Sequence, residues 1–187
     1  MELIEALATR RTNGAFGAAV PPREVVAEII EAATWAPNHR HTEPWRFFVL
    51  AGGARTELGD CVAAEMQADG ATDAQIESTR KKLVRSPVVV VVGQAGSPND
   101  PVLDLEDYAA CCCATQNLLL AAHARGLASK WSTGALATMA AAKEYLSLAP
   151  HDRIVAYVYL GYPDADAQPE RAQRAAAPID WRGFESG

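Results

Sequence analysis

The sequence lacks an excess of basic residues. Its 187 residues include 17 Lys and Arg against 23 Asp and Glu, which gives a formal net charge of −6 at pH 7. Because nucleic-acid binders and proteins that adsorb to anionic membranes carry basic surfaces, this balance argues against both classes. Hydrophobic residues make up 49% and charged residues 21% of the chain, a balance typical of a globular protein with a sizeable core.

Export and membrane signals are also missing from the sequence. The N-terminus, Met1 to Glu5, carries acidic residues where a signal peptide needs positive charge. The longest apolar stretch, residues 109–128, contains Gln116, Asn117 and Arg125. These side chains make it too polar for a transmembrane helix. The sequence therefore predicts a protein of the cytoplasm.

Cysteines are few, and their spacing does not suit a metal. Cys111, Cys112 and Cys113 are consecutive, and Cys61 stands alone. Neighbouring residues on a helix point about 100° apart, so the three thiols do not converge on one ion. We interpret the four cysteines as small core residues of a protein from a reducing compartment.

Several motifs that would identify a nucleotide or metal site are absent. Neither G-x-G-x-x-G nor G-x-x-x-x-G-K-[ST] occurs, and Gly93-Gln94-Ala95-Gly96 lacks the third glycine of a dinucleotide fingerprint. His39 and His41 share one polar segment, but no third ligand is near in sequence. A metal site is therefore not expected.

The hydrophobic pattern predicts a single α+β domain over residues 1–187. Helices outnumber strands, which indicates two or three layers. The predicted helices cover residues 2–9, the segment from Pro21 to just before Pro37, and residues 54–68, 72–84, 102–125 and 136–146. The predicted strands cover residues 45–50, 88–92 and 153–160. Residues 129–134 are a short polar segment with one large aromatic, and residues from Pro163 onward are expected to form an extended tail.

Three polar segments are candidates for function, and each has a structural alternative. Arg10-Arg11-Thr12 follows the first helix, where it either satisfies the last carbonyls or grips a phosphate. The loop from Ala36 to Phe47 is either a solvated connection or a functional loop held by rigid elements. Lys130 to Gly134 places an indole beside two hydroxyls, which suits either a flat aromatic ligand or a core tryptophan near a turn.

Taken together, these segments resemble the FMN-dependent nitroreductase family. The resemblance rests on R-R-[ST] at residues 10–12 and on A-P followed by P-W-R-F within residues 36–47. It also rests on the valine strand after Ser86-Pro87, on G-L-x-x-x-W at residues 126–131, and on the strand at residues 154–163. It covers essentially the whole chain, and His39 and the compact length resemble a small branch of the family.

The resemblance implies an α+β homodimer with a central mixed, mostly antiparallel sheet flanked by helices, a C-terminal extension, and FMN at the subunit interface. It implies that the phosphate and ribityl chain contact Arg10, Arg11 and Thr12. It implies that the same flavin is lined by Trp131, Ser132 and Thr133. Two further residues are implied to reach the flavin of the partner subunit, Trp35 and His39.

By the same resemblance, hydride passes from NAD(P)H through the flavin to an electron-poor acceptor such as a nitroaromatic or quinone, in a ping-pong scheme with no dedicated catalytic side chain. The alternatives are a flavin enzyme with other chemistry (dehalogenation, dehydrogenation or flavin breakdown) and a non-catalytic flavin-binding protein. Two positions depart from the family pattern, since Glu43 stands where Gln is common and His41 where Asn is common. Arg171 and Arg174 are candidates for a further phosphate contact. The natural acceptor and the choice between NADH and NADPH stay open.

Overall fold

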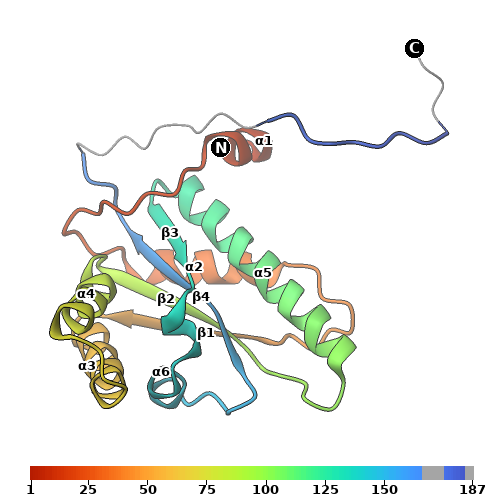
Figure 1. Ribbon diagram of the computed structural model, residues 1–187. Helices are drawn as coiled ribbons and strands as arrows, with labels where there is room; N and C mark the ends of the chain where they lie inside the picture. The colour runs from red at the N-terminus through yellow and green to blue at the C-terminus, as the bar shows by residue number, and fades with distance from the viewer. Residues whose placement is uncertain (166–174, 184–187) are drawn as a thin grey trace.

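The computed structural model describes residues 1–165 and 175–183. The elements, in chain order (Figure 1), are α1 (Leu3–Thr9), α2 (Arg23–Thr34), β1 (Trp45–Ala51), α3 (Gly53–Ala68), α4 (Asp73–Val84), β2 (Val88–Gln94), α5 (Pro101–Ala124), β3 (Ala128–Ser132), the 3₁₀ turn η1 (Ala135–Thr138), α6 (Ala140–Tyr145) and β4 (Arg153–Gly161). Arg171 and Arg174 lie outside the described residues. Residues 175–183 have no helix or strand and are exposed.

The four strands form one sheet in the order β1-β2-β4-β3, and each strand pair is antiparallel. Successive residues of the buried strand β2 face opposite sides of the sheet. Val88, Val90 and Val92 pack with α2 and α5, whereas Val89 and Val91 pack with α3, α4 and α6. The fold is therefore α+β with three layers, which confirms the predicted class and decides between two layers and three.

The long helix α5 has clear start and stop signals in the sequence. The Asp100 side chain accepts a hydrogen bond from the Leu103 amide at 3.0 Å, and Pro101 occupies the first turn. Gly126 has φ +73°, and its amide donates to the His123 carbonyl, a glycine-terminated helix end. Most of the inner face of α5 is buried against the sheet. No helix within the described residues is long and apolar enough to cross a membrane.

The short polar segment at residues 129–134 contains a strand that the sequence pattern did not predict. Ala128–Ser132 forms the edge strand β3, which pairs with β4 from Ala128 opposite Gly161 to Ser132 opposite Tyr157. An edge strand exposes one side to solvent, so its mixed polarity gives little sequence signal, and the pairing with β4 is a tertiary effect. The predicted helix 136–146 is also split, into η1 and α6.

The interpretation of all four cysteines as core residues was correct only for Cys111. Its side chain is fully buried, and burial raises the pKa of its thiol to about 12. Cys112 is partly buried, while Cys61 and Cys113 are exposed. Residues 111–113 lie on a helix with one buried face, so consecutive positions necessarily include an exposed one.

Candidate functional site

Tertiary structure brings two of the three candidate segments together. Thr12 forms a parallel bridge with Ser129, and the Asn13 amide donates to the Ser129 carbonyl at 3.1 Å. The segment that follows Arg10 and Arg11 therefore runs beside β3, at the start of the predicted 130–134 segment. An antiparallel bridge between Phe16 and Pro163 holds the same N-terminal segment beside the end of β4.

A cavity of about 460 Å³ lies next to β3, between α3, α4 and η1. Ser132 and Thr133, two of the predicted flavin-contacting residues, line it. Trp131 does not, because side chains alternate along the strand and its indole packs against the core on the α5 side. The Trp131 indole N–H donates to the Thr133 hydroxyl oxygen at 3.2 Å. Further lining residues are Glu65, Met66, Asp69, Thr79, Gly134, Ala135, Leu136, Thr138 and Met139.

Three basic side chains, Lys82, Arg85 and Lys130, also line this cavity. We refer to them as the cationic cluster. Within residues 1–165 and 175–183 none of the three forms an ion pair, so their charge faces the cavity without a carboxylate partner. A side chain at Gly14 would meet Lys130 Cδ at 3.4 Å and Arg85 at 3.8 Å, so the N-terminal segment borders the cluster directly.

The cavity has a rigid wall on each side of the cluster. The Arg85 guanidinium lies 6.0 Å from the centroid of the buried Tyr159 ring, a cation–π contact. Burial raises the pKa of the Tyr159 hydroxyl, and the nearby Arg85 opposes that rise. On the other side, the Glu65 carboxylate accepts hydrogen bonds from the Ala140 and Ala141 amides at 3.1 and 2.6 Å. These contacts join α3 to the start of α6 and fix the shape of the site.

The arginine pair sits at the junction of α1 and α5. The Arg11 guanidinium donates to the carbonyls of Ala8 at 2.9 Å and of Arg10 at 2.8 Å, so it closes the helix end as the structural alternative expects. Nearby, the His123 Nε2–H donates to the Thr9 hydroxyl oxygen at 2.8 Å, because that hydroxyl donates to the Glu5 carbonyl. Burial, then Arg10 and Arg11, lowers the pKa of His123. The two guanidinium groups therefore add to the effect of burial on His123.

The loop after α2 lies elsewhere in the same protomer. The His39 Nδ1–H donates to the Glu106 carboxylate at 3.0 Å, near the N-terminal end of α5, whereas the arginines lie near His123 at its other end. At about 1.5 Å of rise per helical residue, the two ends are about 25 Å apart. Trp35 is 83% exposed. Neither His39 nor Trp35 therefore joins the cavity of its own chain.

A buried carboxylate holds this loop. Asp107 is only 2% exposed and accepts hydrogen bonds from the Thr42 hydroxyl at 2.5 Å and the Asn38 side-chain amide at 3.3 Å. The Asn38 side-chain oxygen in turn accepts from the Glu43 backbone amide at 2.8 Å. His41 and Glu43 adopt positive φ angles of 51° and 46° and are exposed. The backbone conformation of the loop, rather than packing against other side chains, therefore sets where these two side chains point.

Sequence reasoning missed the cationic cluster. The predicted helix at residues 72–84 was assigned no functional side chain, and within Lys130 to Gly134 only Trp131, Ser132 and Thr133 were expected to contact the flavin. One signal was available, since Ser78, Lys82 and Arg85 recur at the i, i+4, i+7 spacing of one helix face. That α4 faces β3 across a cavity is decided by tertiary packing alone. No group of His, Cys, Asp and Glu side chains among the described residues is arranged to hold a metal.

Residues 7–162 match the sequence profile of the Nitroreductase family. The chain belongs to the nitroreductase family. Other members are similar along most of their length. Escherichia coli K12 YdjA, to which an NAD(P)H nitroreductase activity is ascribed, is 29% identical over 167 residues, 89% of this chain and 91% of the relative. A Haemophilus influenzae protein with the same ascribed activity is 28% identical over 185 residues, 98% of each chain.

Solved nitroreductase structures share the fold. A nitroreductase-like protein from Bacillus cereus superimposes with a TM-score of 0.80 at 31% identity, covering 94% of this chain and 92% of that one. A Desulfovibrio desulfuricans protein ascribed to the nitroreductases, crystallised in complex with FMN, superimposes with a TM-score of 0.68 at 25% identity, covering 95% and 97%. The nitroreductase fold predicted from the sequence is confirmed.

Proposed function

We propose that this chain is an FMN-dependent oxidoreductase that passes hydride from NAD(P)H through flavin to an electron-poor acceptor such as a nitroaromatic or quinone. The observation that carries the proposal is the cationic cluster, which borders Gly14, in the segment that follows Arg10-Arg11-Thr12 and runs beside β3. In a chain of net charge −6, such a concentration of cations indicates an anionic ligand. The FMN-bound relative and the NAD(P)H nitroreductase names of two others support the same ligand and activity.

The residues present fit FMN. Its phosphate carries about two negative charges near neutral pH, and Arg10, Arg11 and the Thr12 hydroxyl supply guanidinium and hydroxyl donors for it. Arg11 would exchange its two carbonyl partners for phosphate oxygens. Ser132 and Thr133 offer hydroxyl groups at the cavity wall. The Trp131 indole donates a hydrogen bond to the Thr133 hydroxyl and packs against the core on the α5 side of β3.

When bound, FMN supplies the hydride chemistry, and the protein supplies orientation and electrostatics. Lys82, Arg85 and Lys130 favour negative charge in the cavity, and therefore the binding of an electron-rich ring. The negative charge of Glu65, which also lines the cavity, is partly offset because its carboxylate accepts hydrogen bonds from the α6 amides. No protein side chain is needed as a dedicated acid or base.

We also propose that the active form is a homodimer with FMN at the subunit interface, in which Trp35 and His39 reach the partner's flavin. Large apolar side chains exposed in the single chain support a second copy. They lie on α1 (Leu3, Ile4, Leu7), on α5 (Val102, Leu105) and at Trp35. We further propose that residues 1–187 form one domain, and that the protein works in the cytoplasm, where four free cysteines are compatible with the redox state.

One set of measurements tests this proposal. The purified protein is expected to hold one FMN per chain, and its flavin absorbance is expected to bleach on addition of NADH or NADPH and return on addition of an acceptor. Varying NAD(P)H at several fixed acceptor concentrations should give parallel double-reciprocal lines. Protein without flavin would contradict the proposal, intersecting lines would contradict the ping-pong scheme, and stoichiometric flavin that does not bleach would favour a binding protein.

A further inference from the structure

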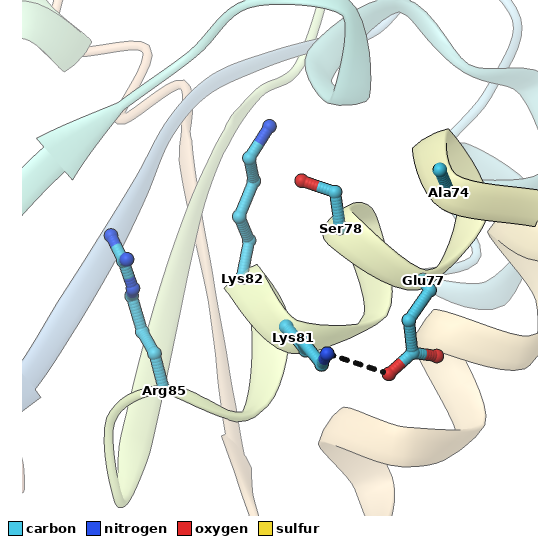
Figure 2. Close-up of a pocket in the computed structure, with 6 residues that line it drawn as sticks. All are labelled: Ala74, Glu77, Ser78, Lys81, Lys82 and Arg85. Atoms are coloured by element: carbon cyan, nitrogen blue, oxygen red, sulfur yellow. Dashed lines mark ion pairs between the residues drawn. The ribbon is translucent and has the colours of Figure 1, made fainter.

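A second depression, of about 440 Å³, lies on the outer side of α4 and adjoins the first cavity. Figure 2 shows its lining residues, Ala74, Glu77, Ser78, Lys81, Lys82 and Arg85. Lys82 and Arg85 line both depressions. In Figure 2 the Ser78 hydroxyl, the Lys82 ammonium group and the Arg85 guanidinium point toward the same side of α4. A ligand that extends from the first cavity along α4 therefore stays next to positively charged side chains.

The charge of this surface is strongly positive for an acidic chain. Four of six consecutive residues, 80 to 85, are basic. Arg80 is neutralised by Asp60 at 2.9 Å, and Lys81 pairs with Glu77 at 3.4 Å. Lys82 and Arg85 form no ion pair within the described part of the chain, which leaves a local excess of about two positive charges.

These groups have the chemistry of a site for a phosphate monoester. Ser78, Lys82 and Arg85 share one helix face at i, i+4, i+7 spacing, which brings a hydroxyl donor, an ammonium group and a guanidinium together. A monoester carries about two negative charges near neutral pH, which matches the local excess. The two candidate sources are the 5′-phosphate of FMN and the 2′-phosphate of NADPH.

We propose that the α4 depression binds the 2′-phosphate of NADPH and makes this chain prefer NADPH over NADH. The inference rests on the proposed function. The FMN phosphate has its own donors in Arg10-Arg11-Thr12, where the two arginines lie near His123 of α5. The side chain of Lys81 is 74% exposed, which suits a coenzyme that enters and leaves at every turnover better than a retained one.

Glu77 has a definite part in this site. Its carboxylate occupies Lys81 and lies in the same depression, so it competes with a phosphate for that cation. Substitutions of Glu77 and Lys81, four residues apart, should therefore have opposite effects on phosphate binding. Removing Lys81 weakens the phosphate contact, and removing the charge of Glu77 strengthens it.

The test compares kcat/KM for NADPH and NADH in the FMN-loaded enzyme. The double variant Ser78→Ala/Lys81→Gln leaves the residues of the flavin cavity intact, and it is expected to lower kcat/KM for NADPH about five- to tenfold while leaving NADH unchanged. Glu77→Gln is expected to raise the NADPH to NADH ratio about two- to fivefold. Lys143→Gln, on α6, is the matched control and should leave the ratio unchanged.

A binding measurement separates this inference from the proposed function. Calorimetry with FMN present in excess compares 2′,5′-ADP, which carries the 2′-phosphate, with 5′-AMP, which lacks it. We expect wild-type protein to bind 2′,5′-ADP about tenfold more tightly, and the double variant to lose that difference.

Equal affinity of wild-type protein for the two nucleotides would overturn the inference, whether or not the protein oxidises NAD(P)H. A double variant that loses FMN, or that loses NADH and NADPH activity equally, would also overturn it, because the depression would then serve the flavin or the fold. Absence of FMN from wild-type protein would instead contradict the proposed function, and the nucleotide comparison would still decide the 2′-phosphate site.

Discussion

The backbone amide of Asn13 donates a hydrogen bond to the carbonyl of Ser129 at 3.1 Å, across more than half of the chain. Asn13 is itself buried, and its side-chain oxygen accepts from the Ala15 amide at 2.9 Å. This contact seats the segment that follows the arginine pair against the edge strand β3. Gly14 of this segment in turn borders Lys130 and Arg85, so the segment connects the arginine pair to the cationic cluster.

Replacement of the arginines tests the phosphate contact. Arg10→Ala and Arg11→Ala are each expected to weaken FMN binding about ten- to a hundredfold, because each removes a charge-assisted hydrogen bond. The double variant should retain no FMN through purification. Flavin content by absorbance and affinity by fluorescence titration measure the effect. Arg125→Ala is the control, since Arg125 pairs with Glu28 on the surface, and stoichiometric FMN in the double variant would disprove the contact.

His123 provides an internal probe of the same phosphate. Burial, Arg10 and Arg11 hold the pKa of His123 below its usual value. A phosphate dianion bound to the arginines would offset their charge and favour the imidazolium, so FMN is expected to raise this pKa. Titration of the imidazole by NMR, with and without FMN, measures the shift. Riboflavin, which lacks the phosphate, should leave the pKa unchanged, and an equal shift with both flavins would place the phosphate elsewhere.

The same histidine predicts a pH dependence of stability. Because its pKa is lowered in the folded protein, the unfolded chain takes up the proton first as pH falls. The contribution of His123 to stability is therefore complete above its unfolded pKa of about 6.5 and is lost as pH falls below that value. His123→Gln should reduce the slope of unfolding free energy against pH in this range. Identical slopes for both proteins, measured by urea denaturation, would contradict this.

Trp35 tests the contact with a partner's flavin. Its side chain is 83% exposed, so Trp35→Ala is expected to change the free energy of unfolding of the single chain by less than about 0.5 kcal/mol. If the indole packs on the partner's flavin, the substitution should weaken FMN affinity about two- to tenfold. Trp35→Phe should keep most of the affinity. Unchanged FMN binding in Trp35→Ala would exclude the contact.

Asp107 tests the support of the loop that carries His39. Asp107→Ala is expected to lower the free energy of unfolding by about 1–3 kcal/mol, because it leaves the Thr42 hydroxyl and the Asn38 amide without their buried acceptor. Asp107→Asn keeps one acceptor oxygen and should cost less. Urea denaturation of the three proteins gives both values, and equal stability of wild type and Asp107→Ala would mean that the network contributes nothing.

Local sequence determined the elements with strong signals. The run Val88 to Val92 predicted a strand, and it is the inner strand β2, which is buried on both faces. The helix predicted at residues 102–125 is α5, and Gly126, which follows it, adopts the positive φ of a helix end. Such features depend on nearest neighbours along the chain, on side-chain branching and on backbone freedom, so they can be read without knowing what packs where. The motifs at residues 10–12 and 36–47 likewise predicted the family to which the chain belongs.

Tertiary structure alone decided the rest. β3 exists because β4 offers it a partner, since five residues of mixed polarity have no strong strand signal of their own. Lys82 and Arg85 join Lys130 because α4 packs opposite β3, and His39 lies far from Arg10 because α5 separates them. By itself the sequence determined the elements and the chemical groups available. Only the packing of distant segments determined which groups meet, because their distances depend on contacts that no local pattern encodes.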